Sequence, residues 1–144
     1  MIKLEDLQEH ARGLIAANAY FAGETVLAEL GLSNDDREGA LQTRGICISV
    51  LPLDEGRKSS QGAGAAVKSV SVICLLEIQP GVNASASGAQ KDIYRAIRAV
   101  EASLLGYAPT NPSDRYSVNE RAWDFSDHDS GLLAYLQNFT KLVV

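Results

Sequence analysis

The segment from residue 53 to residue 65 contains the residue types that bind phosphate groups, because its glycines lie close to a lysine and to serines. In a phosphate-binding loop a glycine directly precedes the Lys-Ser pair and a helix follows the loop. Here Arg57 separates Gly56 from Lys58, and an apolar strand pattern follows the segment. The later Gly-Ala-Gly run fails as a dinucleotide fingerprint for the same reason. The sequence therefore predicts a flexible hairpin loop that contacts a partner protein. Its candidate contact residues are Arg57, Lys58, Ser59, Ser60 and Gln61.

An acidic stretch, residues 127–131 with the sequence Asp-His-Asp-Ser-Gly, resembles the opening of a calcium-binding loop. Such a loop needs a glutamate at its twelfth position, and Asn138 stands there. Turns between strands are themselves rich in aspartate, serine and glycine. We therefore predict a turn and no metal site, while ion binding by Asp124, Asp127 and Asp129 stays open.

Nucleophilic catalysis requires a serine or cysteine next to an oriented base, and the sequence contains no motif of that kind. Cys47 and Cys74 each lie within an apolar run, which indicates buried, reduced thiols. The two histidines are His10, expected to be a solvated helix residue, and His128, and two are too few for a zinc site of the usual kind. These observations predict no catalytic, cofactor-binding or metal-binding residue, and no enzymatic activity.

The composition favours a single folded domain over residues 1–144. With a net charge of −5, the chain lacks the basic face that nucleic-acid binding requires. No run approaches the roughly 20 apolar residues of a membrane-spanning helix. The first residues also lack the basic and apolar regions of a secretion signal. We therefore expect no nucleic-acid readout, no membrane insertion and a cytosolic location.

Helical spacing of apolar residues predicts an opening helix over residues 4–18. A short apolar run at residues 25–30 predicts a strand. The Ser-Asn-Asp-Asp sequence that follows predicts the start of a short helix ending at Gly45. The best helix is expected over residues 88–105, where Ser87 and Gln90 would form a capping box.

Four longer strands are predicted over residues 46–51, 67–78, 115–125 and 132–144, the last two forming a hairpin. The strand at 67–78 alternates apolar and polar residues until Ile73 and Leu75 make both of its faces apolar. We expect that part to pass beneath a helix or into a subunit contact. The predicted fold is α+β, with a single mixed or antiparallel sheet of about four to five strands and two main helices packed on it.

The order of elements and several local sequences resemble the tail-terminator, or tail-completion, family of minor tail proteins from long-tailed bacteriophages and prophages. The resemblance covers nearly the whole chain, as patterns of elements and hydrophobicity. It is carried by the opening helix, Thr25-Val26-Leu27, Thr43-Arg44-Gly45, the strand from Ile46 to Pro52, the loop and strand ending Leu76-Glu77-Ile78, the lead from Asn83 to Gly88, the helix with Ile93, Ile97 and Val100, and the closing Tyr135-Leu136-Gln137-Asn138-Phe139-Thr140.

This resemblance implies a structural subunit without catalytic residues, often assembled as a hexameric ring, that caps the tail tube and takes part in virion assembly by head–tail joining. Its implied partners are other tail and head-connector proteins and further copies of the chain, as a homo-oligomer. Its implied location is the bacterial host cytoplasm during assembly and then the virion tail. Ile73 and Leu75 are the candidate subunit-contact residues.

Two other classes stay open. A small-ligand-binding module would have an apolar pocket between the sheet and the helix at residues 87–105. An uncharacterised enzyme would bring ionisable side chains together in a cleft, with Asp124, His128 and Asp129 as the candidates.

Overall fold

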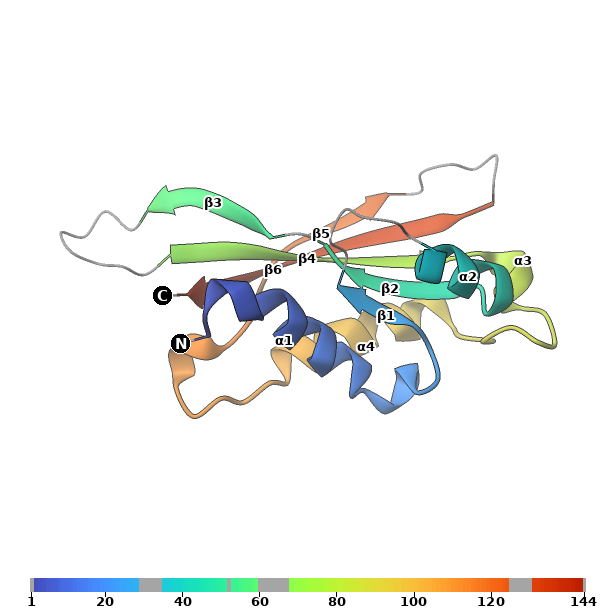
Figure 1. Cartoon of the computed structure of the whole chain (residues 1–144), viewed down its shortest axis with the longest axis horizontal. Coiled ribbons are helices and arrows are strands. Elements are labelled where there is room, and N and C mark those ends of the chain that lie inside the picture. Colours follow the sequence, from blue (N-terminus) through green and yellow to red (C-terminus); the bar gives the residue numbers. More distant parts are fainter. Residues whose placement is uncertain (1, 29–34, 52, 60–67, 125–130, 144) are drawn as a thin grey trace.

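The computed structural model describes residues 2–28, 35–51, 53–59, 68–124 and 131–143 (Figure 1). The helices in these ranges are α1 (Leu4–Ala16), α2 (Asp35–Thr43), α3 (Pro80–Asn83) and α4 (Ile93–Leu105), with two short 3-10 helices, η1 (Ala19–Phe21) and η2 (Pro112–Asp114). The strands are β1 (Val26–Ala28), β2 (Ile46–Val50), β3 (Asp54–Ser59), β4 (Lys68–Ile78), β5 (Ser117–Asp124) and β6 (Leu133–Val143).

All six described strands form one mixed sheet in the order β1-β2-β4-β6-β5, with β3 paired to β4. β1 and β2 are parallel, and the other pairs are antiparallel. The longest pairing joins β4 to β6, from Lys68 opposite Val143 to Ile78 opposite Leu133. This sheet, with its helices, confirms the predicted α+β class.

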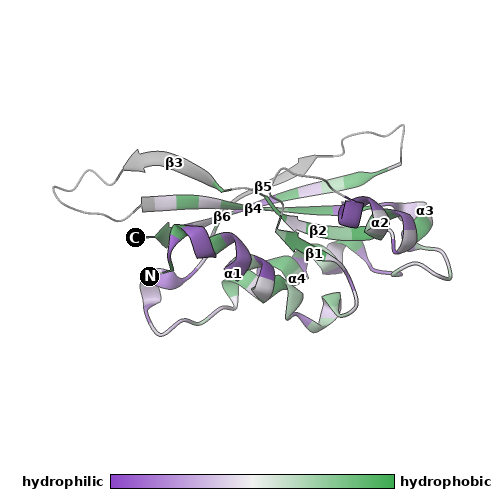
Figure 2. Cartoon of the chain, in the orientation of Figure 1, coloured by the Kyte–Doolittle hydropathy of each residue, from purple (hydrophilic) through white to green (hydrophobic). Residues whose placement is uncertain are grey.

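The two long helices, α1 and α4, lie on one face of the sheet, which we call the helix face (Figure 1). α1 presents Leu7, Ala11 and Ile15 to the core at helical spacing. The core also contains one row from each central strand, including Ile48, Leu76 and Phe139. Figure 2 shows green, apolar stretches on α4 and on the strands β2 and β4. The two predicted main helices are therefore present, on the same side of the sheet.

The first helix ends at Ala16, earlier than the predicted residue 18. Asn18 has an extended backbone, and its side chain accepts a hydrogen bond from the Tyr20 backbone N–H at 2.9 Å. This contact caps η1. Asparagine favours such a cap over a helix interior because its short side chain competes for backbone groups.

The predicted start of the long helix at residue 88 is wrong, because α4 begins at Ile93. Asp92, not Ser87, is the N-cap, and its Oδ1 accepts from the Arg95 N–H at 3.0 Å. Gly88 instead lies against the backbone carbonyls of Val82 and Asn83, where a Cβ would overlap them. The segment before α4 is therefore packed against α3 and is not part of the helix.

Two contacts of Asn83 explain how that segment is held. Its side-chain amide donates to the Lys91 carbonyl at 2.9 Å, and its Oδ1 accepts from the Lys91 N–H at 3.1 Å. The Gln90 N–H donates to the Asn83 carbonyl at 2.8 Å, and Gln90 has a positive φ of 53°. A left-handed residue reverses the chain and is incompatible with a helix through Gln90.

The prediction of a loop over residues 53–65 is wrong for its first half, because β3 occupies Asp54–Ser59. The reason lies in β4, which is longer than its neighbour. β2 pairs with Cys74 to Ile78, so the start of β4 would have an unpaired edge. β3 pairs with that edge, placing Asp54 opposite Ser71 and Ser59 opposite Lys68. Backbone pairing, which needs no apolar side chains, thus forms a strand in a polar sequence. Residues 60–65 lie outside the described ranges.

Candidate functional site

The predicted partner-contact residues do not form a described site. Arg57, Lys58 and Ser59 belong to β3, so the expectation that they lie in a loop is wrong. Ser60 and Gln61 lie outside the described residues, as do Asp127, His128 and Asp129. Asp124 ends β5, but its side chain is not among those described. Contact of these residues with a partner or ion stays a prediction.

The sheet face opposite α1 and α4, which we call the open face, contains the predicted pair Ile73 and Leu75. Their neighbours in β4, Val72, Cys74 and Leu76, are at most 1% exposed and belong to the core of the helix face. Successive strand residues point to opposite faces, so Ile73 and Leu75 do not lie beneath α1 or α4. Both are partly exposed.

Two further leucines lie beside them on the open face. Leu136 of β6 is directly opposite Leu75, and the Leu51 N–H donates to the Ile73 carbonyl at 2.9 Å. Leu51 and Leu136 are also partly exposed. We call Leu51, Ile73, Leu75 and Leu136 the open-face patch. A solvated face of an antiparallel sheet is normally polar, so four apolar side chains at this place need an explanation.

A buried polar atom adjoins the patch. Asn138 is directly opposite Ile73, so the two side chains share the open face. Its Oδ1 is buried and has no hydrogen-bond partner in the described structure. Unpaired buried acceptors cost free energy.

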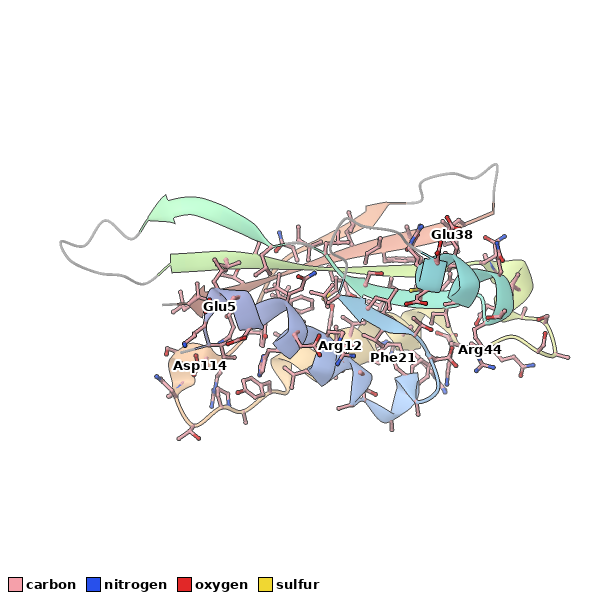
Figure 3. All side chains as sticks on the ribbon, viewed as in Figure 1. Glu5, Arg12, Phe21, Glu38, Arg44 and Asp114 are labelled. Atoms are coloured by element: carbon pink, nitrogen blue, oxygen red, sulfur yellow. The ribbon has the colours of Figure 1, made fainter. Side chains whose placement is uncertain are left out.

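The other end of the open face is closed by α2, which Figure 3 shows at the end of the molecule where Glu38 is labelled. Beneath it, Cys47, Ser49 and Glu77 are at most 2% exposed. The Arg37 guanidinium of α2 pairs with both carboxylate oxygens of Glu77, with Nε 2.5 Å from Oε1. This bidentate pair neutralises a buried carboxylate and holds α2 on the sheet.

The two cysteines lie on opposite faces. Cys74 is opposite Val50 on the helix face, whereas Cys47 is opposite Glu77 on the open face. Both are buried, reduced thiols, as predicted. Burial raises the pKa of the Cys74 thiol to about 12, which keeps it protonated and unreactive at neutral pH.

A polar group that the sequence patterns missed lies at the other end of the helix face. We call it the His10 cluster; its members are His10, Tyr107, Asp114, Tyr116 and Lys141. The His10 Nδ1 lies 2.7 Å from the Tyr116 hydroxyl, and the two rings are stacked with centroids 5.9 Å apart. The rings of Tyr107 and His10 pack edge to face, with their centroids 4.8 Å apart. His10 is thus half-buried and bonded, and the prediction that it is a solvated helix residue is wrong.

Lys141 is the member of this cluster that belongs to β6, and it is fully buried. Its ammonium donates to the Asp114 backbone carbonyl, lies 3.4 Å from the Asp114 Oδ1 and sits 5.3 Å from the centre of the Tyr116 ring. The Asp114 Oδ1 also accepts from the Ile2 N–H at 3.1 Å. Figure 3 shows Asp114 beside the amino-terminal end of α1.

Burial shifts the protonation of the cluster. It lowers the pKa of Lys141, although Asp114 opposes that shift. It also lowers the pKa of His10, and the Lys141 charge lowers it further. Burial raises the pKa of Tyr116, so its hydroxyl stays protonated. The bond between His10 and Tyr116 forms with either group as the donor, according to the tautomer of the imidazole.

The sequence contained one signal of this cluster. Lys141 occupies the same face of β6 as Phe139 and Val143, an apolar row in which a lysine is out of pattern. Its partner Asp114 and the His10–Tyr116 pair depend on contacts between distant parts of the chain, which no local pattern reveals. Each of these groups contacts at least one other member of the cluster, an arrangement typical of a structural role.

Among the residues that the structure describes, no three histidine, cysteine, aspartate or glutamate side chains are grouped as a metal site would require. The helices within the described ranges are also too short or too polar to span a bilayer.

No protein-family model matches this chain, and no curated protein matches it.

Proposed function

We propose that this protein is a structural subunit that acts by self-association, as a tail-terminator-like protein that caps a bacteriophage or prophage tail tube and helps to join it to the head. The open-face patch is the observation that carries the self-association. The resemblance in element order and hydrophobic pattern supplies the phage role. The proposed partners are copies of the chain, tail proteins and head-connector proteins, in the host cytoplasm and then in the virion tail.

The patch suits a protein contact for a physical reason. Covering partly exposed leucine and isoleucine side chains removes apolar area from water, at about 25 cal/mol for each Å². This term favours a protein surface over water on this face.

The ligand-binding alternative has less support. Its expected pocket lies between the sheet and α4, where Ala96, Ile97, Val100 and Leu104 are at most 9% exposed and belong to the core. That interface is occupied by the protein's own side chains. The enzyme alternative rests on Asp124, His128 and Asp129, whose side chains are outside the description.

The test of self-association compares two identical substitutions on opposite sides of the molecule. Leu75→Glu places a charge in the patch, and Leu105→Glu places one on α4, where Leu105 is 42% exposed. Light scattering should show an oligomer for the wild type and for Leu105→Glu, and a smaller particle for Leu75→Glu with an unchanged circular-dichroism spectrum. A monomeric wild type, or equal masses for all three proteins, refutes assembly through the patch.

The phage role needs a separate test. Deleting the gene from a phage or prophage that contains it should produce unjoined heads and tails, visible by electron microscopy, and wild-type protein supplied in trans should restore joining. Normal particles without the protein would exclude the role even if the purified protein is an oligomer.

A further inference from the structure

We propose that α2 is a displaceable lid, which opens while the rest of the protein stays folded and uncovers Cys47, Ser49 and Glu77, the covered strip of the open face. The strip adjoins the open-face patch, because Ser49 is directly opposite Leu75. Opening would therefore enlarge the exposed part of that face and add the Glu77 carboxylate to it. The proposal is independent of the proposed function, since it concerns how the chain covers part of its own sheet.

α2 buries much less apolar surface than α1 or α4. Of its nine residues only Ala40 is buried, whereas α1 buries three side chains and α4 buries four. A helix is stabilised in a protein mainly by packing its apolar face on other elements. Among these three helices, α2 is therefore the one that detaches most easily.

The sequence of α2 also gives it little helical stability of its own. Gly39 lies in the helix interior, where glycine is less favourable than alanine. A helix of nine residues is too short to persist alone in water. Once detached, α2 should lose its helical structure, so the residue at position 39 affects how often the lid opens.

An ion pair joins α2 to the covered strip. The Arg37 guanidinium pairs with both oxygens of Glu77, whose side chain is 3% exposed, while that of Arg37 is 26% exposed. Burial of such a pair removes water from both charges, and this cost offsets much of their attraction. Opening returns both charges to water, so the pair resists opening less than an apolar contact of the same size would.

The two cysteines report separately on the lid and on the whole fold. Cys47 belongs to the covered strip, with its Sγ 3.9 Å from the Ser49 hydroxyl, and Cys74 belongs to the core of the helix face. Both are at most 1% exposed, so a maleimide reaches each thiol only after an opening. Displacement of α2 should expose Cys47 alone, whereas global unfolding exposes both.

Maleimide labelling of the native protein, with mass spectrometry of the two cysteine peptides, tests the lid. Cys47 should react faster than Cys74, and its rate should change little in dilute urea, because a local opening exposes little surface. The rate for Cys74 should rise steeply with urea. Equal rates for the two thiols, or an equal dependence on urea, would overturn the proposal.

Two matched glycine substitutions distinguish the lid from global unfolding. Gly39 in α2 and Gly13 in α1 both have open space where a Cβ would be, so alanine should stabilise each helix. Gly39→Ala should slow the labelling of Cys47 about fivefold. Gly13→Ala should slow only Cys74, since α1 stays folded when the lid opens. Equal slowing of Cys47 by both substitutions, or none by Gly39→Ala, would overturn the lid.

Removal of the ion pair should act in the opposite direction. Arg37→Gln leaves the Glu77 carboxylate buried without this cation, and should accelerate the labelling of Cys47 about a hundredfold. Arg12→Gln removes the same charge from a pair with Glu9 on the surface of α1, and should leave the rate unchanged. An unchanged rate in Arg37→Gln would refute the role of the pair in closing the lid. The urea dependence of the wild type remains decisive if Arg37→Gln does not fold.

Discussion

Replacing the buried Lys141 by methionine should leave the fold intact and raise its stability. The ammonium is fully buried and lies close to one carboxylate, whose oxygen also accepts from Ile2. Replacing a whole buried ion pair by apolar side chains is often neutral or stabilising, because the desolvation cost exceeds the attraction, whereas removing one partner destabilises when the other charge stays buried. Asp114, with its side chain 13% exposed, can keep partial hydration and the Ile2 contact. We expect Lys141→Met to increase the free energy of unfolding by about 1–2 kcal/mol at neutral pH.

Removing the other partner should have the opposite effect. Asp114→Ala leaves the Lys141 ammonium buried, although its bond to the backbone carbonyl of residue 114 remains. We expect a loss of about 2 kcal/mol, smaller than for a charge left with no acceptor. Urea unfolding followed by circular dichroism measures both changes. A Lys141→Met protein that is less stable than Asp114→Ala would refute the reasoning about the cluster.

The pH dependence supplies an independent check on the same variant. The pKa of Lys141 is lowered in the folded state by burial, so the folded protein loses this proton at a lower pH than the unfolded chain. Wild-type stability should therefore rise relative to Lys141→Met as the pH increases from about 7.5 towards about 9.5. The His10 pKa should also be higher in Lys141→Met, because the repelling charge is gone. A His10 pKa that does not change would contradict that electrostatic contact.

Gly88→Ala should destabilise the protein by about 2 kcal/mol, because the new Cβ would overlap the backbone carbonyls of Val82 and Asn83. Gly81→Ala, which has open space around the new Cβ, is the matched control in thermal unfolding. Equal losses of stability in the two variants would contradict the packing argument. Asp92→Ala should cost about 1 kcal/mol through loss of the α4 cap, whereas Asp92→Asn should retain most of that stability in urea. Cys74 should react with a maleimide only in denaturant, since burial raises its pKa to about 12; rapid labelling of the folded protein would show that the thiol is accessible.

Hydrophobic periodicity was sufficient to predict the elements whose burial dominates their conformation. α1, β4 and β6 lie within a few residues of the predicted ranges because each has an apolar row at the period of its own structure. The same rows indicated that the open face near Ile73 and Leu75 is apolar. What covers that face is a property of a second molecule, which stays a prediction.

The misplaced elements depend on backbone contacts that side-chain patterns do not encode. β3 forms in the polar stretch after Leu53 because β4 offers an unpaired edge. α4 starts late because Gly88 is required against α3 and Gln90 adopts a left-handed conformation. The His10 cluster was missed because its bonds join α1 to residues far along the chain.

The position of β6 has a consequence for how the protein is made. β6 follows the other described strands in sequence, yet it lies in the interior of the sheet, between β4 and β5. While the chain is being synthesised, β4 can pair with β2 and β3, but its other edge lacks its partner until β6 has emerged. Strand edges of this kind template aggregation.

Removing β6 would delete a central strand and separate β5 from the sheet. A chain truncated before β6 should therefore aggregate and should not form a shorter folded protein. The sheet thus stays incomplete until β6 has been synthesised.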